Sequence, residues 1–206
     1  ATMLSPNPQK IGATYCRSKD LPPSSTNGEF RWLLRGSGIV RWFELEFVHK
    51  VAPAETVELL RSLVLKIEHG CESIDDEGTT VAEIPLGDFF SAYRDASANN
   101  NYFLGYNEQS QRFYCRLPIT FKKNLRLSIA SDIPGMSRLR MVAGVDMMDP
   151  KTVPALTLRS NFVRAVGSSS AESAQFDVKG AARLIASMFS FTSPSSSQVI
   201  QDQDFG

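Results

Sequence analysis

The stretch VAEIPLGDFFSAYRD, residues 81–95, places the carboxylate of Asp88 directly before two phenylalanines, Phe89 and Phe90. Sugar sites combine an aromatic face with a few polar groups, so Asp88 could accept a sugar hydroxyl while Phe89, Phe90 or Trp42 provides the stacking surface. The packing alternative is that Asp88 closes a turn by accepting backbone N–H groups, while the phenylalanines fill the core. The sequence favours the packing alternative and keeps the sugar site as a competing hypothesis.

Arg41 is a charged residue within an otherwise apolar strand face. If its guanidinium is buried, it needs a carboxylate partner, for which Asp88 or Glu83 is the candidate. A structural ion pair is favoured over a catalytic one. The predicted substrate-binding residues are therefore Asp88, Arg41, Trp42 and Phe89, and no catalytic residue is assigned.

Other reactive side chains lack the spacing of a metal or nucleophile site. His49 and His69 lie at predicted strand ends without a cysteine or carboxylate at metal-ligand spacing, so no metal and no cofactor are expected. The acidic run at 75–77 could bind calcium with the help of backbone oxygens, but a solvated hairpin turn is favoured. The three cysteines are odd in number and widely spaced, so they are interpreted as structural thiols: Cys16, Cys71 and Cys115.

The overall charge gives no reason to expect nucleic-acid or membrane binding. The 206 residues include 22 lysines plus arginines and 22 aspartates plus glutamates. A small basic patch near Arg116 is formed by Lys122, Lys123 and Arg126. We interpret this patch as a solvated face or a subunit contact in preference to a nucleic-acid site. A single-stranded RNA site would need exposed aromatics between basic residues, and only Tyr114 is available. No apolar run approaches the ~20 residues that cross a bilayer, so we expect a soluble protein. The sequence leaves the compartment open, with an extracellular protein and a part of an assembled particle as alternatives.

Alternation of apolar and polar residues, which is typical of half-buried strands, dominates the chain from residue 36 to 147. In GSGIVRWFELEF one parity is apolar from residue 39 to 47, except at Arg41. Pro85 cannot donate a ladder hydrogen bond, so the strand TVAEIPLGDFF is predicted at a sheet edge or broken by a bulge. Residues 91–111 are predicted as a loop, and the other predicted strands are LRSLVLKIEHG, RFYCRLPITF, NLRLSIAS, LRMVAGVDM and ALTLRSNFVRAV.

Many short strands joined by glycine, proline and asparagine turns predict an all-β fold, either a β-sandwich, a jelly roll or a barrel. The region after residue 150 differs, because GSSSAESA and SPSSS are serine-rich. Between them, FDVKGAARLIASMF fits a short helix or a strand. We predict one domain over residues 1–150. Residues 151–206 are predicted to add strands and a serine-rich C-terminal segment, or to begin a truncated second domain.

Four segments share their order and spacing with one family: GSGIVRWFELEF, LRSLVLKIEHG, VAEIPLGDFF and RFYCRLPITFKKNLRLSIAS. They resemble the domain-of-unknown-function family 2961, which includes glycoside hydrolase family 172. In that family a Gly-Pro-Gly-type turn leads into an Ile-Arg strand, and the string VPLGDFF precedes a strand that is closed by basic residues. The most specific match is PLGDFF at residues 85–90, and the resemblance runs from about residue 15 to 146.

The resemblance implies a double jelly roll, in which this chain is the N-terminal jelly roll and residues 151–206 begin a truncated second one. It also implies assembly as trimers or multiples of trimers, and activity on fructofuranoside or arabinofuranoside linkages. The same architecture resembles double-jelly-roll capsid proteins, which gives a structural alternative. Glu29 in STNGEF and Cys16 in TYCRS stand where the family has acids.

The family's two catalytic glutamates, in Gly-Glu-Gly-Asp and Gly-Thr-Glu-Asp-Tyr contexts, have no match in this sequence. Furanoside hydrolysis needs two carboxylates held about 5 to 9 Å apart. We therefore expect an antiparallel jelly-roll sandwich that shapes a furanoside site and an oligomer interface without the acid and the nucleophile. Its expected partners are copies of itself and a furanoside-containing glycan. The alternatives are a self-assembling, capsid- or shell-like subunit and a lectin-like sugar-binding module.

Overall fold

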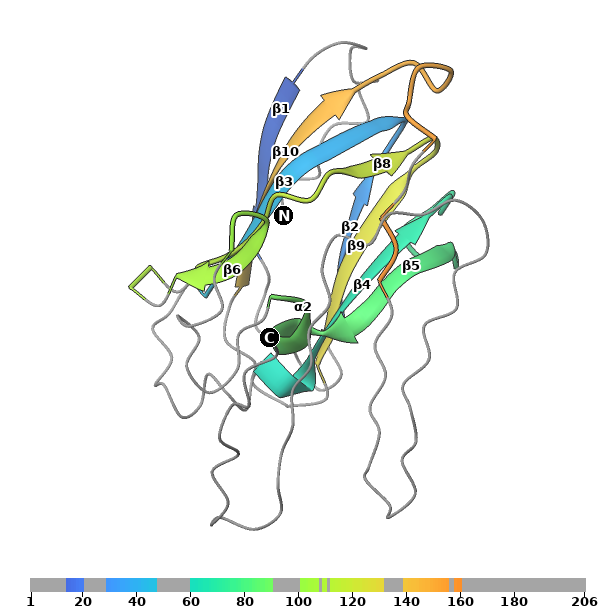
Figure 1. Ribbon diagram of the computed structural model, residues 1–206. Helices are drawn as coiled ribbons and strands as arrows, with labels where there is room; N and C mark the ends of the chain where they lie inside the picture. Colours follow the sequence, from blue (N-terminus) through green and yellow to red (C-terminus); the bar gives the residue numbers. More distant parts are fainter. Residues whose placement is uncertain are drawn as a thin grey trace, which may run out of the picture. The chain divides into compact units, whose positions relative to one another are not determined.

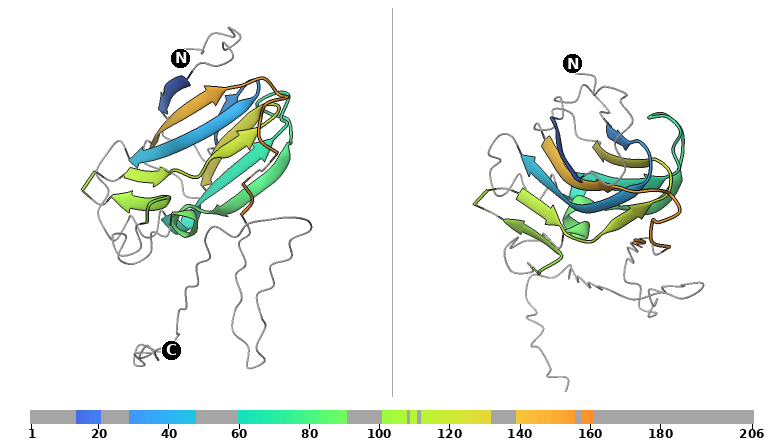
Figure 2. Two further views of the ribbon diagram at one scale, coloured as in Figure 1. Left: turned by 45° about the horizontal axis from the view of Figure 1, so that its top comes forward. Right: turned by 90° about the horizontal axis from the view of Figure 1, so that it is seen from above.

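The structure is a computed structural model that describes residues 14–20, 29–47, 60–90, 101–107, 109–110, 112–131, 139–155 and 158–160. In these ranges the chain forms two antiparallel sheets (Figures 1 and 2). The larger sheet contains, in spatial order, β1 (Thr14–Asp20), β10 (Leu139–Met147), β3 (Gly38–Phe47), β7 (Arg112–Cys115) and β6 (Leu104–Asn107), with β8 (Ile119–Phe121) also paired to β3. The smaller sheet contains β2 (Phe30–Leu34), β9 (Leu125–Ser131), β4 (Leu63–His69) and β5 (Thr79–Pro85).

Both sheets turn alternate side chains toward one shared core. Phe43 and Leu45 of β3, Leu65 and Ile67 of β4 and Leu127 of β9 are fully buried and belong to the same apolar cluster. The residues between them on each strand point to the outer faces, because successive side chains of a strand alternate. The all-β prediction is confirmed, and the shared core makes the fold a two-layer sandwich.

A β-bulge interrupts β3 at Arg41. In the pairing with β10, Trp42 faces Gly144 and Val40 faces Val145, so Arg41 is the extra residue with no residue opposite. One extra residue exchanges the two faces of a strand. Beyond the bulge, Val40 therefore enters the core, and the predicted single apolar parity from residue 39 to 47 is wrong.

The strand predicted over TVAEIPLGDFF ends at Pro85, and the next four residues form the helical turn α2 (Leu86–Phe89). Pro85 has no N–H to continue the ladder, so the chain can leave the sheet there. Among the described strands the predicted edge position is confirmed, since β5 is the last strand of the smaller sheet and its strand partner is β4. A register shift against β4 also leaves Val81 as an extra residue.

Further differences concern which segments form strands and where these strands end. The predicted strand RFYCRLPITF is split into β7 and β8 around Pro118, and β6 lies within the predicted loop at 91–111. Strands β1 and β2 were not predicted at all. The segment ALTLRSNFVRAV was predicted as a strand, but its described residues, 155 and 158–160, are irregular. The rest of that segment, FDVKGAARLIASMF and the serine-rich segments lie outside the described residues.

Candidate functional site

The structure separates the four predicted substrate-binding residues into two pairs. Arg41 and Trp42 belong to the outer side of β3. Phe89 is buried in the core, with its ring centroid 6.1 Å from that of Phe43, and Asp88 is half-buried beside it on α2. Phe43 and Trp42 are consecutive residues on opposite faces of β3, so the larger sheet lies between Phe89 and Trp42. The phenylalanine therefore packs inside the sandwich and does not share a surface with the tryptophan.

Arg41 forms an ion pair with Asp146, with 2.5 Å between Nε and Oδ2. The predicted partners were Asp88 and Glu83, and this prediction is wrong. The bulge directs Arg41 to the surface, where its side chain is 54% exposed and reaches the end of the neighbouring strand β10. Glu83 lies on the smaller sheet instead, with its carboxylate 3.9 Å from the ammonium group of Lys66.

Trp42 is half-buried and lies directly over Gly144. A Cβ atom at Gly144 would come within 2.7 Å of the indole Cε2 and 3.0 Å of Cδ1. These distances are too short for carbon atoms, so the absence of a side chain at Gly144 is what allows the indole to rest on the strand. The result is a tryptophan held against the outer face of the larger sheet, next to the Arg41–Asp146 pair.

A second aromatic group lies on the same outer face. Tyr114 of β7 faces Glu44 of β3, and Trp42 is two residues from Glu44 on the same side. Such diagonal neighbours are roughly 7 to 8 Å apart. The guanidinium carbon of Arg116, directly after β7, lies 5.3 Å from the ring centre of Tyr114 and 5.4 Å from that of Tyr102. We refer to Trp42, Tyr114, Tyr102 and Arg116 as the aromatic strip.

The aromatic strip suits binding better than acid–base chemistry. Its rings offer apolar faces, and Arg41 and Asp146 add a donor and an acceptor beside Trp42. The nearby carboxylates of Glu44 and Glu46 lie 4.0 and 3.2 Å from the guanidinium of Arg112. The strip therefore combines flat apolar surfaces with hydrogen-bonding groups, which is the composition of a ligand site.

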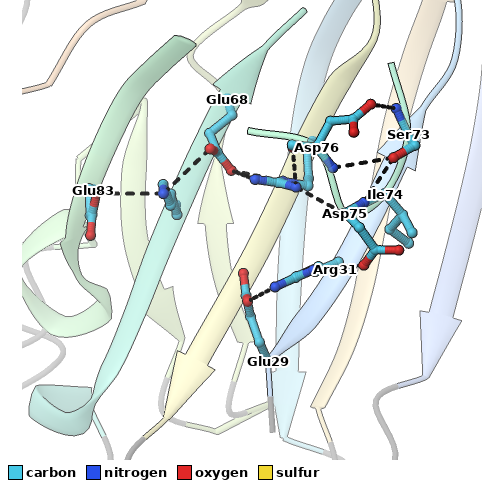
Figure 3. Close-up of polar contacts among 10 residues, drawn as sticks. Glu29, Arg31, Glu68, Ser73, Ile74, Asp75, Asp76 and Glu83 are labelled. Carbon is cyan, nitrogen blue, oxygen red and sulfur yellow. Dashed lines mark hydrogen bonds and ion pairs between the residues drawn. The ribbon is translucent and has the colours of Figure 1, made fainter. Parts of the chain in front are cut away.

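A separate polar network lies on the outer face of the smaller sheet (Figure 3). Nε and Nη2 of Arg126 both donate to Oε2 of Glu68, at 2.8 and 2.5 Å, and the two side chains are 5% and 1% exposed. Nη1 of Arg126 donates to the carbonyl oxygens of Ile74 and Asp76. The arginine thus joins β9 and β4 to the loop between β4 and β5, and the prediction that Arg126 belongs to a surface basic patch is wrong.

The same loop contains the acidic run at 75–77. Asp75 pairs with Arg31 of β2 at 2.9 Å, and the carboxylate of Asp76 accepts the backbone N–H of Ser73. Arg31 also binds Glu29 at 2.6 Å. Desolvation raises the pKa of Glu29, but the hydrogen bond and charge of Arg31, the hydroxyl of Ser128 and the charge of Arg126 outweigh it and lower the pKa. The loop is attached to the sheet through both its backbone and its side chains.

The remaining reactive side chains are two buried cysteines, Cys115 and Cys71, and the half-buried His69. Burial raises the pKa of the Cys115 thiol to about 12, against a smaller opposite effect of a hydrogen bond to Leu117, and burial also raises the pKa of Cys71. His69 has a pKa lowered first by burial and then by the charge of Arg159. In the described ranges no three His, Cys, Asp or Glu side chains gather closely enough to hold a metal ion. None of the helices in these ranges has the length and apolar character to cross a membrane.

Of the residues on this surface, the sequence singled out Arg41 and Trp42 as candidates and named Arg116 only beside a basic patch. It did not single out Asp146 or Tyr102. The only signal for Tyr102 was an aromatic pair after three asparagines in NNNYF. No protein-family model matches the chain, and none of the curated proteins searched matches it.

Proposed function

We propose that the chain is a sugar-binding jelly-roll domain that holds a furanoside-containing glycan on the aromatic strip and does not hydrolyse it. The observation that carries the proposal is Trp42 resting on Gly144 beside the Arg41–Asp146 pair, with Tyr114 next along the same face. A sugar ring has an apolar C–H face and a rim of hydroxyls. The indole suits the C–H face, and the ion pair suits the hydroxyls.

The strand order supports the jelly-roll part of the proposal. A jelly roll forms when a long antiparallel ribbon rolls up, so that early strands pair with late strands in a nested series. The pairs β1 with β10, β2 with β9, β3 with β7 and β8, and β4 with β5 are nested in this way. Lectin domains and capsid subunits both use this architecture, so the fold alone does not select the function.

Two parts of the proposal rest on the sequence resemblance: that the glycan contains a furanoside, and that the chain does not hydrolyse it. The glutamate motifs of the resembled family are missing from the chain. Glycoside hydrolysis needs a proton donor and a second carboxylate on either side of the bond. Near the strip, Asp146, Glu44 and Glu46 each lie within 4.0 Å of an arginine. This arrangement favours holding a ligand over transferring a proton to it.

Tryptophan fluorescence tests the proposal directly, because the chain has two tryptophans and the other, Trp32, is only 2% exposed. Titration with fructofuranosyl and arabinofuranosyl oligosaccharides should change the emission of Trp42. Trp42→Phe should abolish the change, and Trp42→Ala should weaken binding measured by calorimetry. Arg112→Gln, on the same face but outside the strip, is the matched control. Undiminished binding by Trp42→Ala would refute the proposed site, and release of free sugar by the unmodified chain would refute the non-catalytic part.

The second candidate is a self-assembling structural subunit, which the nested strand order also favours. If the chain is such a subunit, we expect trimers or a closed shell in dilute solution and no affinity for glycans. Light scattering combined with the fluorescence titration separates the two. A trimer that binds the oligosaccharides fits the sugar-binding proposal, whereas an assembly without any glycan binding replaces it.

A further inference from the structure

Among the described residues Arg116 has no carboxylate partner, unlike the two other arginines near the aromatic strip. Arg41 pairs with Asp146, and Arg112 pairs with Glu44 and Glu46. Arg116 is exposed, and no carboxylate of the described ranges lies within 4.0 Å of it. Its guanidinium lies over two rings, those of Tyr102 and Tyr114.

These rings hold the guanidinium by cation–π attraction, which acts within about 6 Å of a ring centre. The N–H groups of a guanidinium lie in its own plane. When the guanidinium rests on ring faces, these groups can therefore still donate hydrogen bonds from its edge. A planar fork of this kind matches a carboxylate, to which it can donate two parallel hydrogen bonds. Arg116 is therefore presented as a donor for an anion that the described part of the chain does not supply.

The aromatic residues and the loop that contact Arg116 are held in place by hydrogen bonds within the protein. The hydroxyl of Tyr114 donates to the carbonyl of Asn101 at 2.6 Å, and the amide oxygen of Asn101 accepts the N–H groups of Phe103 and Leu104, both at 2.8 Å. The N–H of Arg116 donates to the carbonyl of Phe103 at 2.7 Å. Because these bonds position the loop and the strand end beforehand, a ligand does not have to order them.

An apolar surface adjoins this donor. Tyr102 is 73% exposed and Phe103 is 41% exposed, and their rings meet edge to face with 5.3 Å between centroids. The ligand should therefore combine a carboxylate with an apolar face. Single-stranded nucleic acid fits less well, because it requires a positively charged groove along its backbone. Here Arg41 and Arg112 are already paired with acids, and the chain has no net charge.

We propose that Arg116, with Tyr102 and Phe103, forms an acidic-sugar subsite, so that the glycan bound by the strip carries a carboxylate, as in a uronic acid. The carboxylate accepts hydrogen bonds from the guanidinium, while the sugar ring lies against the exposed aromatic faces. This inference rests on the proposed sugar-binding function and adds the class of sugar that the site selects.

The test compares the affinity of the full chain for three ligands by calorimetry: a galacturonate oligosaccharide, the same oligosaccharide after reduction of its carboxyl groups, and a neutral arabinofuranosyl oligosaccharide. We expect the galacturonate form to bind at least about tenfold more tightly than its reduced form, the size of one charge-assisted hydrogen bond. Arg116→Gln should remove this preference, and Arg116→Lys should restore part of it, because lysine keeps the charge but not the fork. Arg112→Gln is the control and should keep the full preference.

The outcomes separate the two proposals. Equal affinity for the galacturonate and its reduced form, or a preference that survives in a folded Arg116→Gln variant, overturns the acidic subsite. If the neutral furanoside still binds in that case, the proposed function stands. Binding of the galacturonate with dependence on Arg116, without any affinity for the furanoside, supports the subsite and overturns the furanoside assignment. Tighter binding of a sulfated neutral oligosaccharide than of the galacturonate would overturn the carboxylate as the recognised group.

Discussion

Replacing Arg126 by methionine should destabilise the sandwich more than any change to its exposed ion pairs. The guanidinium donates two hydrogen bonds to Glu68 and two to the loop carbonyls of Ile74 and Asp76, and the Arg126 side chain is only 5% exposed. Arg126→Met leaves the buried carboxylate of Glu68 without these hydrogen bonds, and its remaining charged partner in the described ranges is Lys66, whose Nζ lies 3.4 Å from Oε1. Breaking a buried pair in this way costs about 3 to 5 kcal/mol, against about 5 to 15 kcal/mol for the whole stability of a typical domain.

The assay is urea unfolding followed through the buried Trp32, with Arg112→Met as the control, because its pair with Glu46 is exposed and should contribute no more than about 1 kcal/mol. The double variant Arg126→Met with Glu68→Met should be more stable than Arg126→Met alone, since no charge is then left buried. Proteolysis of the loop should also become faster in Arg126→Met. A loss of stability no larger than in the control, or additive effects of the two substitutions, would refute this reasoning.

Three further predictions concern single side chains. Gly144→Ala should displace the indole of Trp42, cost about 1 to 3 kcal/mol and shift the fluorescence emission; an unchanged spectrum would contradict the packing described for this pair. Cys115, with its pKa near 12, should resist iodoacetamide at pH 8 in the folded chain and react after unfolding, as peptide mapping would show. Because the pKa of His69 is lowered by folding, the unfolded chain binds its proton more readily, so stability should fall as pH drops below about 6.5 toward the lower folded pKa. His69→Gln should lose this part of the pH dependence, and an identical pH profile in that variant would argue against the assignment.

The strands that sequence reasoning located are those whose apolar faces enter the core. In β9, Leu125, Leu127 and Ile129 alternate with residues of the outer face, and the same pattern marks β4 and β10. Strand β1 has the sequence TYCRSKD, with little apolar alternation, and it joins the sheet as an edge strand through its pairing with β10. Strand β2 did carry a usable signal, because Phe30 and Trp32 alternate with polar or half-buried neighbours.

Only those residues of the candidate site that are neighbours in the sequence could be predicted. Arg41 and Trp42 are consecutive in the sequence, and the unusual arginine in an apolar pattern pointed to them. The carboxylate of Asp146 reaches Arg41 only through the register of β10 on β3, across a separation of 105 residues. Arg116 and Tyr102 likewise meet because β6 pairs with β7. Periodicity describes which face a residue takes within its own strand, and it contains no information on which strand lies alongside.

The pairing of β1 with β10 has a consequence for how the chain can fold during synthesis. Thr14 pairs with Asp146, so β1 and β10 lie far apart in the sequence. During synthesis β1 leaves the ribosome early and cannot form its backbone hydrogen bonds with β10 until that strand has also been made. Until then β3 also lacks its neighbour on that side, and both strands expose unpaired backbone groups that can join another chain. Folding that depends on such distant contacts is slow. Any shortened form that stops before residue 139 should therefore aggregate instead of folding into a smaller sandwich.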